Sequence, residues 1–350
     1  MIKQKSHSNK LDIDKLKPVT LIIPMRNELE NIPNLLLGIE DLFKNSKYFE
    51  LILIDDNSVD ASLVKLKEWH DNFENKDKIE ILSIKDGIPS KKKAISKALE
   101  KAKDQWIVQT DADCEITSTW FNSIRQKNNE KYNLIAGPVI FKTDGFWSSL
   151  LTVESWALVL ISYLGFLKEK PQMCSAANLS WNKSILRDHT YSEIIEMEVP
   201  SGDDAYLLNY YNSIDPKKNC YDWSRGSLLK TKAPGSFAQF ANQRLRWASK
   251  WGAIKGLSQR LFPVALWVYH FLHMSLFLAL SLKGYLQIVL ITLLIKALLE
   301  MKMLNDVARN FSHSINFLYV LILQFLYSPY VVIFGLLSQF AAYRWKNVNR

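Results

Sequence analysis

The hydrophobic positions divide the chain into two parts that follow different patterns. Up to about residue 110, short apolar runs alternate with segments whose apolar residues recur at spacings of three and four. The short runs predict β-strands and the spaced residues predict helices. Four strands are expected over 19–23, 49–54, 78–84 and 105–110, with helices over 28–43, 61–73 and 90–102. Strands that alternate with helices favour an α/β domain with a mostly parallel sheet.

The last part of the chain is patterned for a membrane. Residues 261–282 carry no charge over a length that can cross a hydrocarbon core. A second apolar segment, 284–304, contains Lys296 and Glu300 four residues apart, where the two side chains can pair. A third, 315–343, is uncharged but contains Pro329, which predicts either one kinked span or two re-entrant half-helices. We therefore expect two or three membrane helices.

Two other segments complete the expected organisation. The apolar stretch 155–167 follows Glu154 and is too short to cross, so we expect an amphipathic or buried helix that leans on the membrane surface. Residues 1–17 are polar and basic, which excludes a secretory signal peptide and predicts a mobile lead-in. The expected domains are this lead-in, an α/β domain over 18–260 and a transmembrane region over 261–350.

Composition and charge narrow the class of protein. A chain of 350 residues with 48% hydrophobic residues is not disordered. The net charge is +9, and seven basic but only two acidic residues follow Arg260. Balanced charge before that point argues against nucleic-acid binding, whereas basic residues beside apolar segments fit anionic lipid. Cys114, Cys174 and Cys220 have neither disulfide nor zinc spacing, which favours a reducing cytosolic setting.

Polar residues stand where each predicted strand ends. Ligands of parallel sheets bind beyond the carboxyl ends of the strands. These ends carry, in chain order, Asn27 and Glu28, Asp55 and Asp56, Asp86 and Lys91, and finally Asp111 and Asp113. The sequence contains neither a glycine-rich dinucleotide turn nor a Walker motif. A nucleotide bound at this edge would therefore be held by carboxylates and a metal.

Asp111 and Asp113 form a D-x-D directly after the fourth strand. Residues two apart in an extended segment point to the same side, so one cation could offset the repulsion between both carboxylates. An isolated D-x-D is usually a solvated loop or a helix N-cap, but the position after a strand favours a metal site. Oxygen ligands suit Mg²⁺ or Mn²⁺.

The order of these segments resembles a family 2 glycosyltransferase of the inverting GT-A fold with membrane helices appended. The resemblance covers roughly residues 18–251 and rests on "PMRNELENI", "LILIDDNSVDAS", "SKKKAISKAL", "QTDADC", "GDDAYLL" and "QRLRW". It implies a donor half over 18–115 and an acceptor half over 116–260. Ser90 stands where the family usually has glycine, which leaves open whether Lys91 or Lys92 is the functional lysine.

The resemblance also implies roles for individual residues. Asp204 matches the catalytic base, and Asp203 could share or exchange that role. Asp111 and Asp113 match the ligands of Mg²⁺ or Mn²⁺. Contacts with the donor are implied for Asn27, Glu28, Asp56, Lys91, Asp111, Asp113, Gln243, Arg246 and Trp247. Acceptor contacts are implied for Asn178 and Trp247.

Several of these residues have a structural alternative. Asp204 could cap the helix that follows it. Arg246 could meet lipid headgroups, a role that is also expected of Arg244, Lys250 and Lys255. Trp247 could be an interfacial anchor. His270 and His273, inside the first apolar segment, are expected to be packing or headgroup contacts.

These features predict a membrane-bound inverting hexosyltransferase of the plasma (inner) membrane, multi-pass, with a cytosolic catalytic domain. Its expected partners are a nucleotide-diphosphate sugar, a membrane, and a lipid, lipid-linked or polysaccharide acceptor of the cell envelope. One alternative is a processive polysaccharide synthase, although two or three spans are few for a chain-conducting pore. Others are a sugar-nucleotide nucleotidyltransferase, whose usual glycine- and arginine-rich loop is missing, and a non-catalytic scaffold. The side on which Arg344, Lys346 and Arg350 lie depends on whether the third segment crosses or re-enters.

Overall fold

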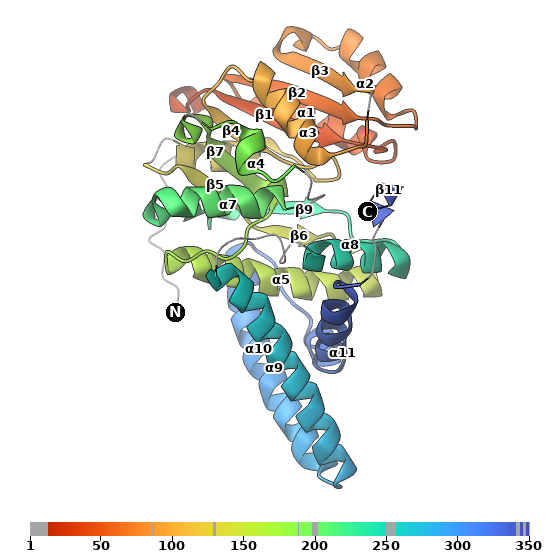
Figure 1. Cartoon of the computed structure of the whole chain (residues 1–350). Helices are drawn as coiled ribbons and strands as arrows, with labels where there is room; N and C mark the ends of the chain where they lie inside the picture. The colour runs from red at the N-terminus through yellow and green to blue at the C-terminus, as the bar shows by residue number, and fades with distance from the viewer. Residues whose placement is uncertain are drawn as a thin grey trace.

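A computed structural model describes residues 13–85, 87–128, 131–187, 189–197, 202–249, 257–340, 344–345 and 348–349. An α/β domain lies at one end, and a pair of long helices projects from it at the other (Figure 1). Most of the predicted lead-in, together with Asp86, Lys250 and Lys255, lies outside the described residues.

The central sheet has seven strands in the order β3-β2-β1-β4-β7-β5-β8. The strands that precede the D-x-D are parallel, whereas β7 runs antiparallel to both β4 and β5. Their bounds are β1 Val19–Met25, β2 Phe49–Asp56, β3 Ile79–Ile84, β4 Trp106–Gln109, β5 Leu134–Ala136, β7 Leu179–Asn182 and β8 Asn219–Tyr221. The predicted α/β fold with a mostly parallel sheet is confirmed. Two small sheets pair β6 Val139–Phe141 with β9 Leu229–Thr231, and β10 Arg344–Trp345 with β11 Val348–Asn349.

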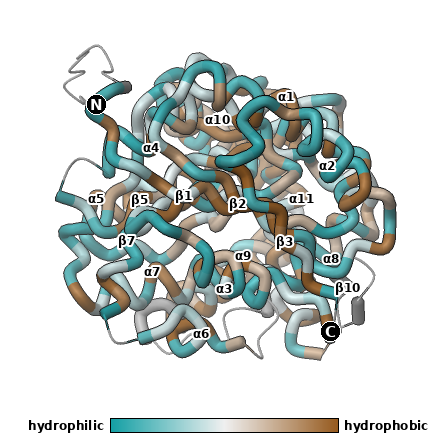
Figure 2. The backbone as a smooth tube through the Cα atoms, turned by 90° about the horizontal axis from the view of Figure 1, so that it is seen from above, coloured by the Kyte–Doolittle hydropathy of each residue, from teal (hydrophilic) through white to brown (hydrophobic). Residues whose placement is uncertain are grey.

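Helices cover both faces of the sheet because successive residues of its strands point to opposite sides. Leu21 packs with the helices α1 and α4 on one face, whereas Ile22 packs with α3 on the other, and both are fully buried. Seen from above, the apolar strands β1 to β3 lie between more polar helices (Figure 2). The helices of this part are α1 Ile32–Asn45, α2 Ser62–Asp71, α3 Lys91–Lys101 and α4 Ser118–Asn128.

The second half of the α/β domain contributes four further helices and most of the short turns. The helices are α5 Phe146–Leu167, α6 Tyr191–Ile194, α7 Asp203–Ile214 and α8 Phe237–Ser249. Among the described residues the 3₁₀ turns are η1 Ile13–Lys15, η2 Lys76–Lys78, η3 Ala176–Asn178, η4 Lys183–Leu186, η5 Pro216–Lys218 and η6 Arg225–Ser227.

Helix α5 corrects one expectation. The helix begins nine residues before the predicted stretch, at Phe146, and its 22 residues are long and apolar enough to cross a membrane. The prediction that it is too short to cross is therefore wrong in length, because Phe146–Glu154 is helical too. Most of α5 is nevertheless buried within the protein, where Trp156 stacks on Phe311 with ring centroids 5.8 Å apart.

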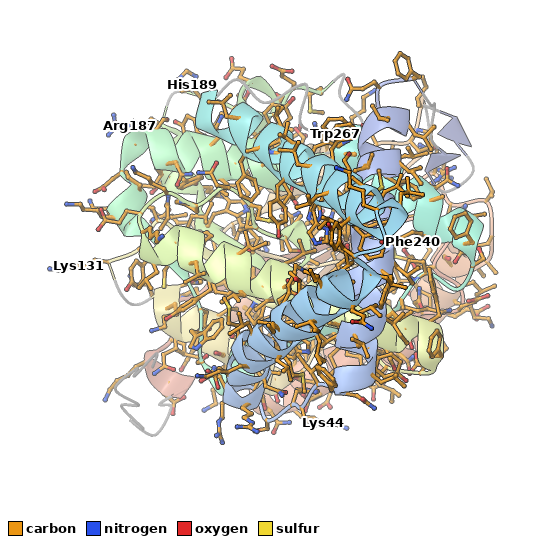
Figure 3. The ribbon with its side chains drawn as sticks, turned by 90° about the horizontal axis from the view of Figure 1, so that it is seen from below. Lys44, Lys131, Arg187, His189, Phe240 and Trp267 are labelled. Atoms are coloured by element: carbon orange, nitrogen blue, oxygen red, sulfur yellow. The ribbon has the colours of Figure 1, made fainter. Side chains whose placement is uncertain are left out.

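The three C-terminal helices are α9 Leu257–Leu282, α10 Leu286–Asn310 and α11 Phe317–Leu337. By length and composition α9 and α11 could cross a membrane. Helices α9 and α10 form a hairpin that leaves the domain (Figure 1). Helix α11 instead lies across them beneath the domain, as the view from below shows (Figure 3).

Helix α11 touches the α/β domain near both of its ends. Tyr319 lies 5.6 Å from Phe146 of α5, and Phe334 lies 5.7 Å from Phe240 of α8, measured between ring centroids. The helix is continuous through Pro329. Of the two expected forms of this segment, the structure gives a single helix.

Polar side chains join the three C-terminal helices. His270 and His273 of α9 each lie 3.0 Å from the Ser328 hydroxyl of α11, measured from Nδ1. Lys296 of α10 donates to Gln324 of α11 at 2.7 Å and pairs with Glu300, which in turn accepts from Gln324. These contacts satisfy polar groups within apolar helices. The two histidines are thus packing residues, as expected.

Candidate active site

One cavity of about 920 Å³ lies between the α/β domain and the helices α5, α9 and α11. Charged residues line the end beside the sheet, and they come from the end of β4 and the starts of α3 and α7. They are Lys91, Lys92, Asp111, Asp113, Asp203 and Asp204. The other end is lined mostly by apolar side chains of α9 and α11.

Lys91 holds two of the predicted carboxylates together. Its ammonium forms an ion pair with Asp111 and lies 4.0 Å from Oδ2 of Asp203, which also accepts a hydrogen bond of 3.0 Å from Gln109. Burial alone would lower the pKa of Lys91, but the charges of Asp111 and Asp203 outweigh it and raise the pKa above its usual value. Lys91 therefore remains a cation beside Asp111, the first residue of the D-x-D.

Lys92 has a different environment. Its ammonium is buried, donates to the backbone oxygen of Glu196 at 2.8 Å and lies 4.6 Å from the ring centre of Tyr206. Ser90 caps α3 by accepting from the backbone N–H of Lys93, which is a role that glycine would not perform. Of the two lysines that the sequence leaves open, the geometry favours Lys91 as the ligand-facing one.

Asp203 and Asp204 are the first two residues of α7. The N-cap is Gly202, whose φ of 94° lies in the left-handed region that favours glycine. Asp204 is therefore not the N-cap, and its Oδ1 accepts from the backbone N–H of Ala205 at 2.8 Å. Both carboxylates line the cavity although each residue is under 10% exposed. The positive end of the helix dipole favours carboxylates at this position.

Helix α8 carries the Q-x-x-R-W residues to the cavity. The cavity is lined by all three residues that the sequence assigns to one site: Gln243, Arg246 and Trp247. The guanidinium of Arg244 lies 4.4 Å from the ring centre of Trp247, so Arg244 occupies one face of that indole. A sugar could use only the other face of Trp247.

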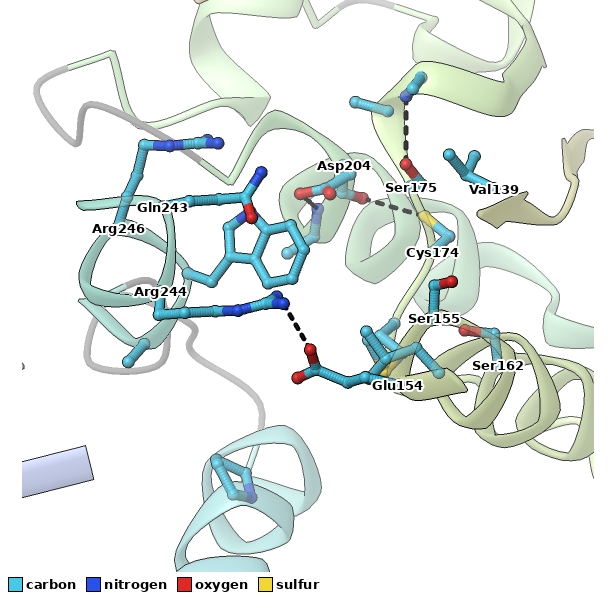
Figure 4. A pocket seen from close by; sticks show the side chains of 18 of the residues that line it. Val139, Glu154, Ser155, Ser162, Cys174, Ser175, Asp204, Gln243, Arg244 and Arg246 are labelled. Atoms are coloured by element: carbon cyan, nitrogen blue, oxygen red, sulfur yellow. Dashed lines mark hydrogen bonds and ion pairs between the residues drawn. The ribbon is translucent and has the colours of Figure 1, made fainter. Parts of the chain in front are cut away.

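Arg244 corrects a further expectation. It was expected to meet lipid headgroups, but it is 2% exposed and forms an ion pair with Glu154 of α5, itself buried (Figure 4). Phe240 and Tyr330 also face its guanidinium, with ring centres 4.9 Å and 5.9 Å away. Arg244 therefore links α8 to α5 and α11 instead of reaching the surface.

Three predicted donor residues lie at the ends of β1 and β2, outside the wall of this cavity. Asn27, with a φ of 50°, accepts from the backbone N–H of Val59 at 2.9 Å, so its side chain shapes the neighbouring loop. Glu28 accepts from Asn31 at 2.6 Å. Burial raises the pKa of Asp56, while the nearby Arg26 opposes that rise. The structure places these residues at the predicted sheet edge, although they do not line the cavity.

Asn178 does not contact the cavity. Its side chain is fully buried, accepts from the indole N–H of Trp120 at 2.9 Å and donates to the backbone oxygens of Pro138 and Ser227. A Cβ at Gly137, which does line the cavity, would come within 2.4 Å of the Asn178 amide. The expected direct contact with an acceptor does not hold, because Asn178 braces the wall from behind.

The residues present fit a metal that also binds a phosphate. Asp111 and Asp113 both line the cavity and offer carboxylate oxygens. Burial raises the pKa of the adjacent Cys114, whose thiol does not line the cavity. Within the described ranges, no group of three or more His, Cys, Asp or Glu residues could hold a metal ion.

Two groups of this site were missed from the sequence. Gln109, which positions Asp203, lies just before the D-x-D. A buried polar residue next to that motif is a signal, because the carboxylates Asp203 and Asp204 need a neighbouring donor to orient them. Glu154 and Arg244 were missed as a pair because 90 residues separate them. A carboxylate at the edge of an apolar stretch is itself a signal, since it needs a partner.

Comparison with known proteins finds one matching family model. Residues 20–188 match the family model described as Glycosyl transferase family 2. This part of the chain, residues 20–188, is therefore similar to a family 2 glycosyltransferase domain. No curated protein sequence matches the chain.

Solved structures with a similar fold are distant in sequence. The mannosyltransferase PcManGT from Pyrobaculum calidifontis, in complex with GDP-Man and Mn²⁺, is 14% identical with a TM-score of 0.55, over 94% of this chain and 89% of that one. S. aureus TarS 1-349 is 14% identical with a TM-score of 0.44, over 70% of each chain. Glucosyl-3-phosphoglycerate synthase from Mycobacterium tuberculosis, in complex with Mn²⁺, UDP-Glc and phosphoglyceric acid, is 14% identical with a TM-score of 0.44, over 62% of this chain and 75% of that one. At 14% identity the likeness to PcManGT concerns the fold alone.

Proposed function

We propose that the protein is a membrane-bound, inverting glycosyltransferase that moves a hexose from a nucleotide-diphosphate sugar to a lipid acceptor at the cytosolic membrane face. The observation that carries this proposal is the continuity of the cavity. A single space joins Asp111, Asp113 and Asp204 to the apolar side chains of α9 and α11. A water-soluble donor can occupy the charged end and a lipid the apolar end.

The donor diphosphate would bind at the charged end. Asp111 and Asp113 would hold Mg²⁺ or Mn²⁺, which offsets the charge that develops on the leaving diphosphate. Lys91 stays protonated beside them. Arg246 would add a forked contact that a point charge provides less well. Gln243 and Trp247 line the same wall and would bound the sugar.

Asp204 would act as the base for the acceptor hydroxyl. The hydroxyl oxygen forms the new bond to the anomeric carbon, and the bond from that carbon to the diphosphate oxygen breaks with its electron pair leaving on the diphosphate. Asp204 accepts the hydroxyl proton. Asp203 is already engaged by Gln109 and lies near Lys91, so its role would be to position Lys91. Attack from the face opposite the diphosphate inverts the anomeric centre.

The helices support a membrane-bound enzyme. In our proposal the hairpin of α9 and α10 enters the bilayer, because most of the long apolar side chains of α9 are exposed. With 26 residues, α9 is about 39 Å long at about 1.5 Å per residue, which exceeds the hydrocarbon thickness of about 30 Å. Helices α5 and α11 would lie along the surface beneath the catalytic domain, which keeps that domain and the C-terminus on one side.

The proposal is tested by incubating the purified full-length protein, in nanodiscs made from total membrane lipid, with Mn²⁺ and a panel of nucleotide sugars. We expect one donor to release its nucleoside diphosphate and a labelled sugar to appear in the lipid fraction. Asp113→Ala should abolish both signals, whereas Asp71→Ala, on the exposed end of α2, should leave them intact. Release that persists in Asp113→Ala or under a chelator would refute the metal-assisted mechanism.

A further inference from the structure

The buried pair of Arg244 and Glu154 faces the acceptor end of the cavity. Both residues line that cavity, and Figure 4 shows them pointing toward one another with Asp204 on the far side of the open space. Tyr330 of α11 faces the guanidinium of Arg244, with its ring centre 5.9 Å away. Any acceptor that extends from Asp204 toward α9 and α11 therefore passes this pair.

Arg244 has hydrogen-bonding capacity that the described residues do not use. One terminal nitrogen donates to Glu154, but Nε and Nη1 have no hydrogen-bond partner in the part of the chain that the structure describes. A buried guanidinium with unmet donors is costly, so a polar group of a ligand that supplies oxygen acceptors would be favoured there. The first observation thus points to an oxygen-bearing ligand beside Arg244.

The charge of the pair restricts what that ligand can be. Glu154 already neutralises Arg244, and both groups are more than 90% buried. A phosphate placed at Arg244 would lie close to the Glu154 carboxylate, and repulsion between like charges is strong in such a poorly hydrated site. An ester, amide or hydroxyl oxygen would accept from Arg244 without that cost. The pair therefore discriminates by charge.

Beyond the pair, Trp267 of α9 forms a fixed apolar wall. Its indole N–H donates to the backbone oxygen of Val332 at 3.1 Å, and its ring stacks on Phe271 with centroids 5.3 Å apart. The ring can lie against α11 because residue 335 is glycine: a Cβ at Gly335 would come within 2.4 Å of Trp267 Cδ1. Pro263 and Phe334 line the same end. This wall suits a hydrocarbon chain.

We propose that Arg244 and Trp267 form the acceptor subsite and that the acceptor is an uncharged lipid alcohol. Such a lipid has a free hydroxyl group, which reacts at Asp204, and a neighbouring ester or amide oxygen, which accepts from Arg244. Its chain lies along Trp267 between α9 and α11. The inference rests on the proposed function for the reaction but concerns the acceptor alone.

The test compares three photoreactive lipids that carry the same diazirine-labelled chain: a dioleoylglycerol, a ceramide and a dioleoyl phosphatidate. Each is added to the full-length protein in phosphatidylcholine nanodiscs, and crosslinked peptides are mapped. At least one neutral probe should label α9 or α11 about tenfold more than the phosphatidate, because like-charge contacts cost several kcal/mol and about 1.4 kcal/mol is tenfold. Unlabelled neutral lipid should compete. Equal or stronger labelling by the phosphatidate, or labelling outside these helices, would overturn the proposal.

Variants of the pair and of the wall sharpen the result. Glu154→Gln keeps the shape but removes the negative charge, so labelling should shift toward the phosphatidate by about tenfold. Glu300→Gln is the matched control, because it removes a carboxylate from an ion pair on α10 that does not line the cavity, and the ratio should stay at the wild-type value. Gly335→Ala should displace Trp267 and reduce labelling by all three probes. An unchanged ratio in Glu154→Gln would refute discrimination by the pair.

Failure of this inference is distinguishable from failure of the proposed function. Donor binding is measured separately, by titrating nucleotide sugars with Mn²⁺ in the absence of any added acceptor. A protein that binds a donor but no neutral lipid would refute the acceptor subsite alone. Neutral-lipid labelling without any donor binding would refute the glycosyltransferase mechanism and leave the lipid subsite standing.

Discussion

The two ends of the cavity solve the problem of buried charge in different ways. At the sheet edge, Asp111, Asp203 and Lys91 face one another where a ligand can still enter, and Asp111 remains about a third exposed. At the helix junction, Glu154 and Arg244 are almost completely buried beside Trp247 and other aromatic rings. The charged residues at the sheet edge can therefore exchange one another for a bound ligand, whereas Glu154 and Arg244 remain paired with each other.

The difference teaches which end should tolerate substitution. A charge at the sheet edge can be screened by solvent or by a bound ion, so losing it should affect binding and turnover more than folding. A charge at the helix junction is screened by neither solvent nor a bound ion, so the loss of its partner should affect folding first. The predictions that follow test this contrast, from the largest expected effect to the smallest.

At the sheet edge, the largest effect is expected for Asp204→Asn. The amide keeps the size of the side chain but cannot accept a proton, so turnover should fall by a factor of about 10²–10⁴. Affinity for the donor should barely change, because Asp204 would act on the acceptor hydroxyl. Steady-state kinetics and donor titration of the same preparation measure both quantities.

The control for that substitution is Asp203→Asn at the neighbouring position. It removes the carboxylate that accepts from Gln109 and lies near Lys91, so donor affinity should fall along with turnover. Wild-type turnover in Asp204→Asn would show that the base has been assigned to the wrong residue. Loss of thermal stability in Asp204→Asn would instead contradict the contrast between the two ends.

At the helix junction, Glu154→Met should lower the free energy of unfolding by about 3–5 kcal/mol, because it leaves a buried charge that arginine cannot shed. Arg244→Met should cost less, since an unpaired Glu154 can take up a proton. The double variant should recover much of the loss, because apolar side chains can replace a buried pair. Thermal unfolding in detergent micelles, for the three variants side by side, checks this order.

A surface pair provides the comparison for that series. Lys65 and Glu68 of α2 lie 2.9 Å apart with both side chains more than half exposed, so Glu68→Met should change the free energy of unfolding by less than about 1 kcal/mol. If Glu154→Met and Glu68→Met cost the same, the junction pair does not hold the helices together as argued.

The sequence predicts the two ends of the cavity unequally, because different features of the fold bring their residues together. Asp111 and Lys91 stand at the ends of elements whose order and direction follow from the hydrophobic pattern, so their meeting at one edge could be foreseen. Arg244 and Glu154 meet only because α8 packs on α5, and no periodicity encodes that contact. Asn178 shows that a residue type suited to binding does not by itself predict a binding role. Its side chain instead supports the cavity wall from behind Gly137.

The smallest effect is expected at Asp56, which lies at the end of β2, and it is a gain in stability that depends on pH. Burial raises the pKa of Asp56 in the folded protein above the ordinary value that it has in the unfolded chain. Both states are protonated well below that ordinary value, so the group then contributes nothing. As the pH rises above it, the unfolded chain loses its proton more readily than the folded protein does, and stability is lost. Asp56→Asn should therefore raise the unfolding temperature at pH 7 but not near pH 3.

If Asp56 also accepts a hydrogen bond from the donor base, the same substitution should weaken donor binding about tenfold, since a bond to a charged group contributes roughly 1.5–3 kcal/mol. Asp41→Asn is the control of opposite sign. Desolvation opposes ionisation of Asp41, but hydrogen bonds from Ser118 outweigh it and lower its pKa, so that variant should be less stable at pH 7 and bind the donor normally. Melting curves between pH 3 and 8, with donor titrations at pH 7, separate the outcomes. A destabilised Asp56→Asn with unchanged donor affinity would mean that this carboxylate supports the fold and does not read the base.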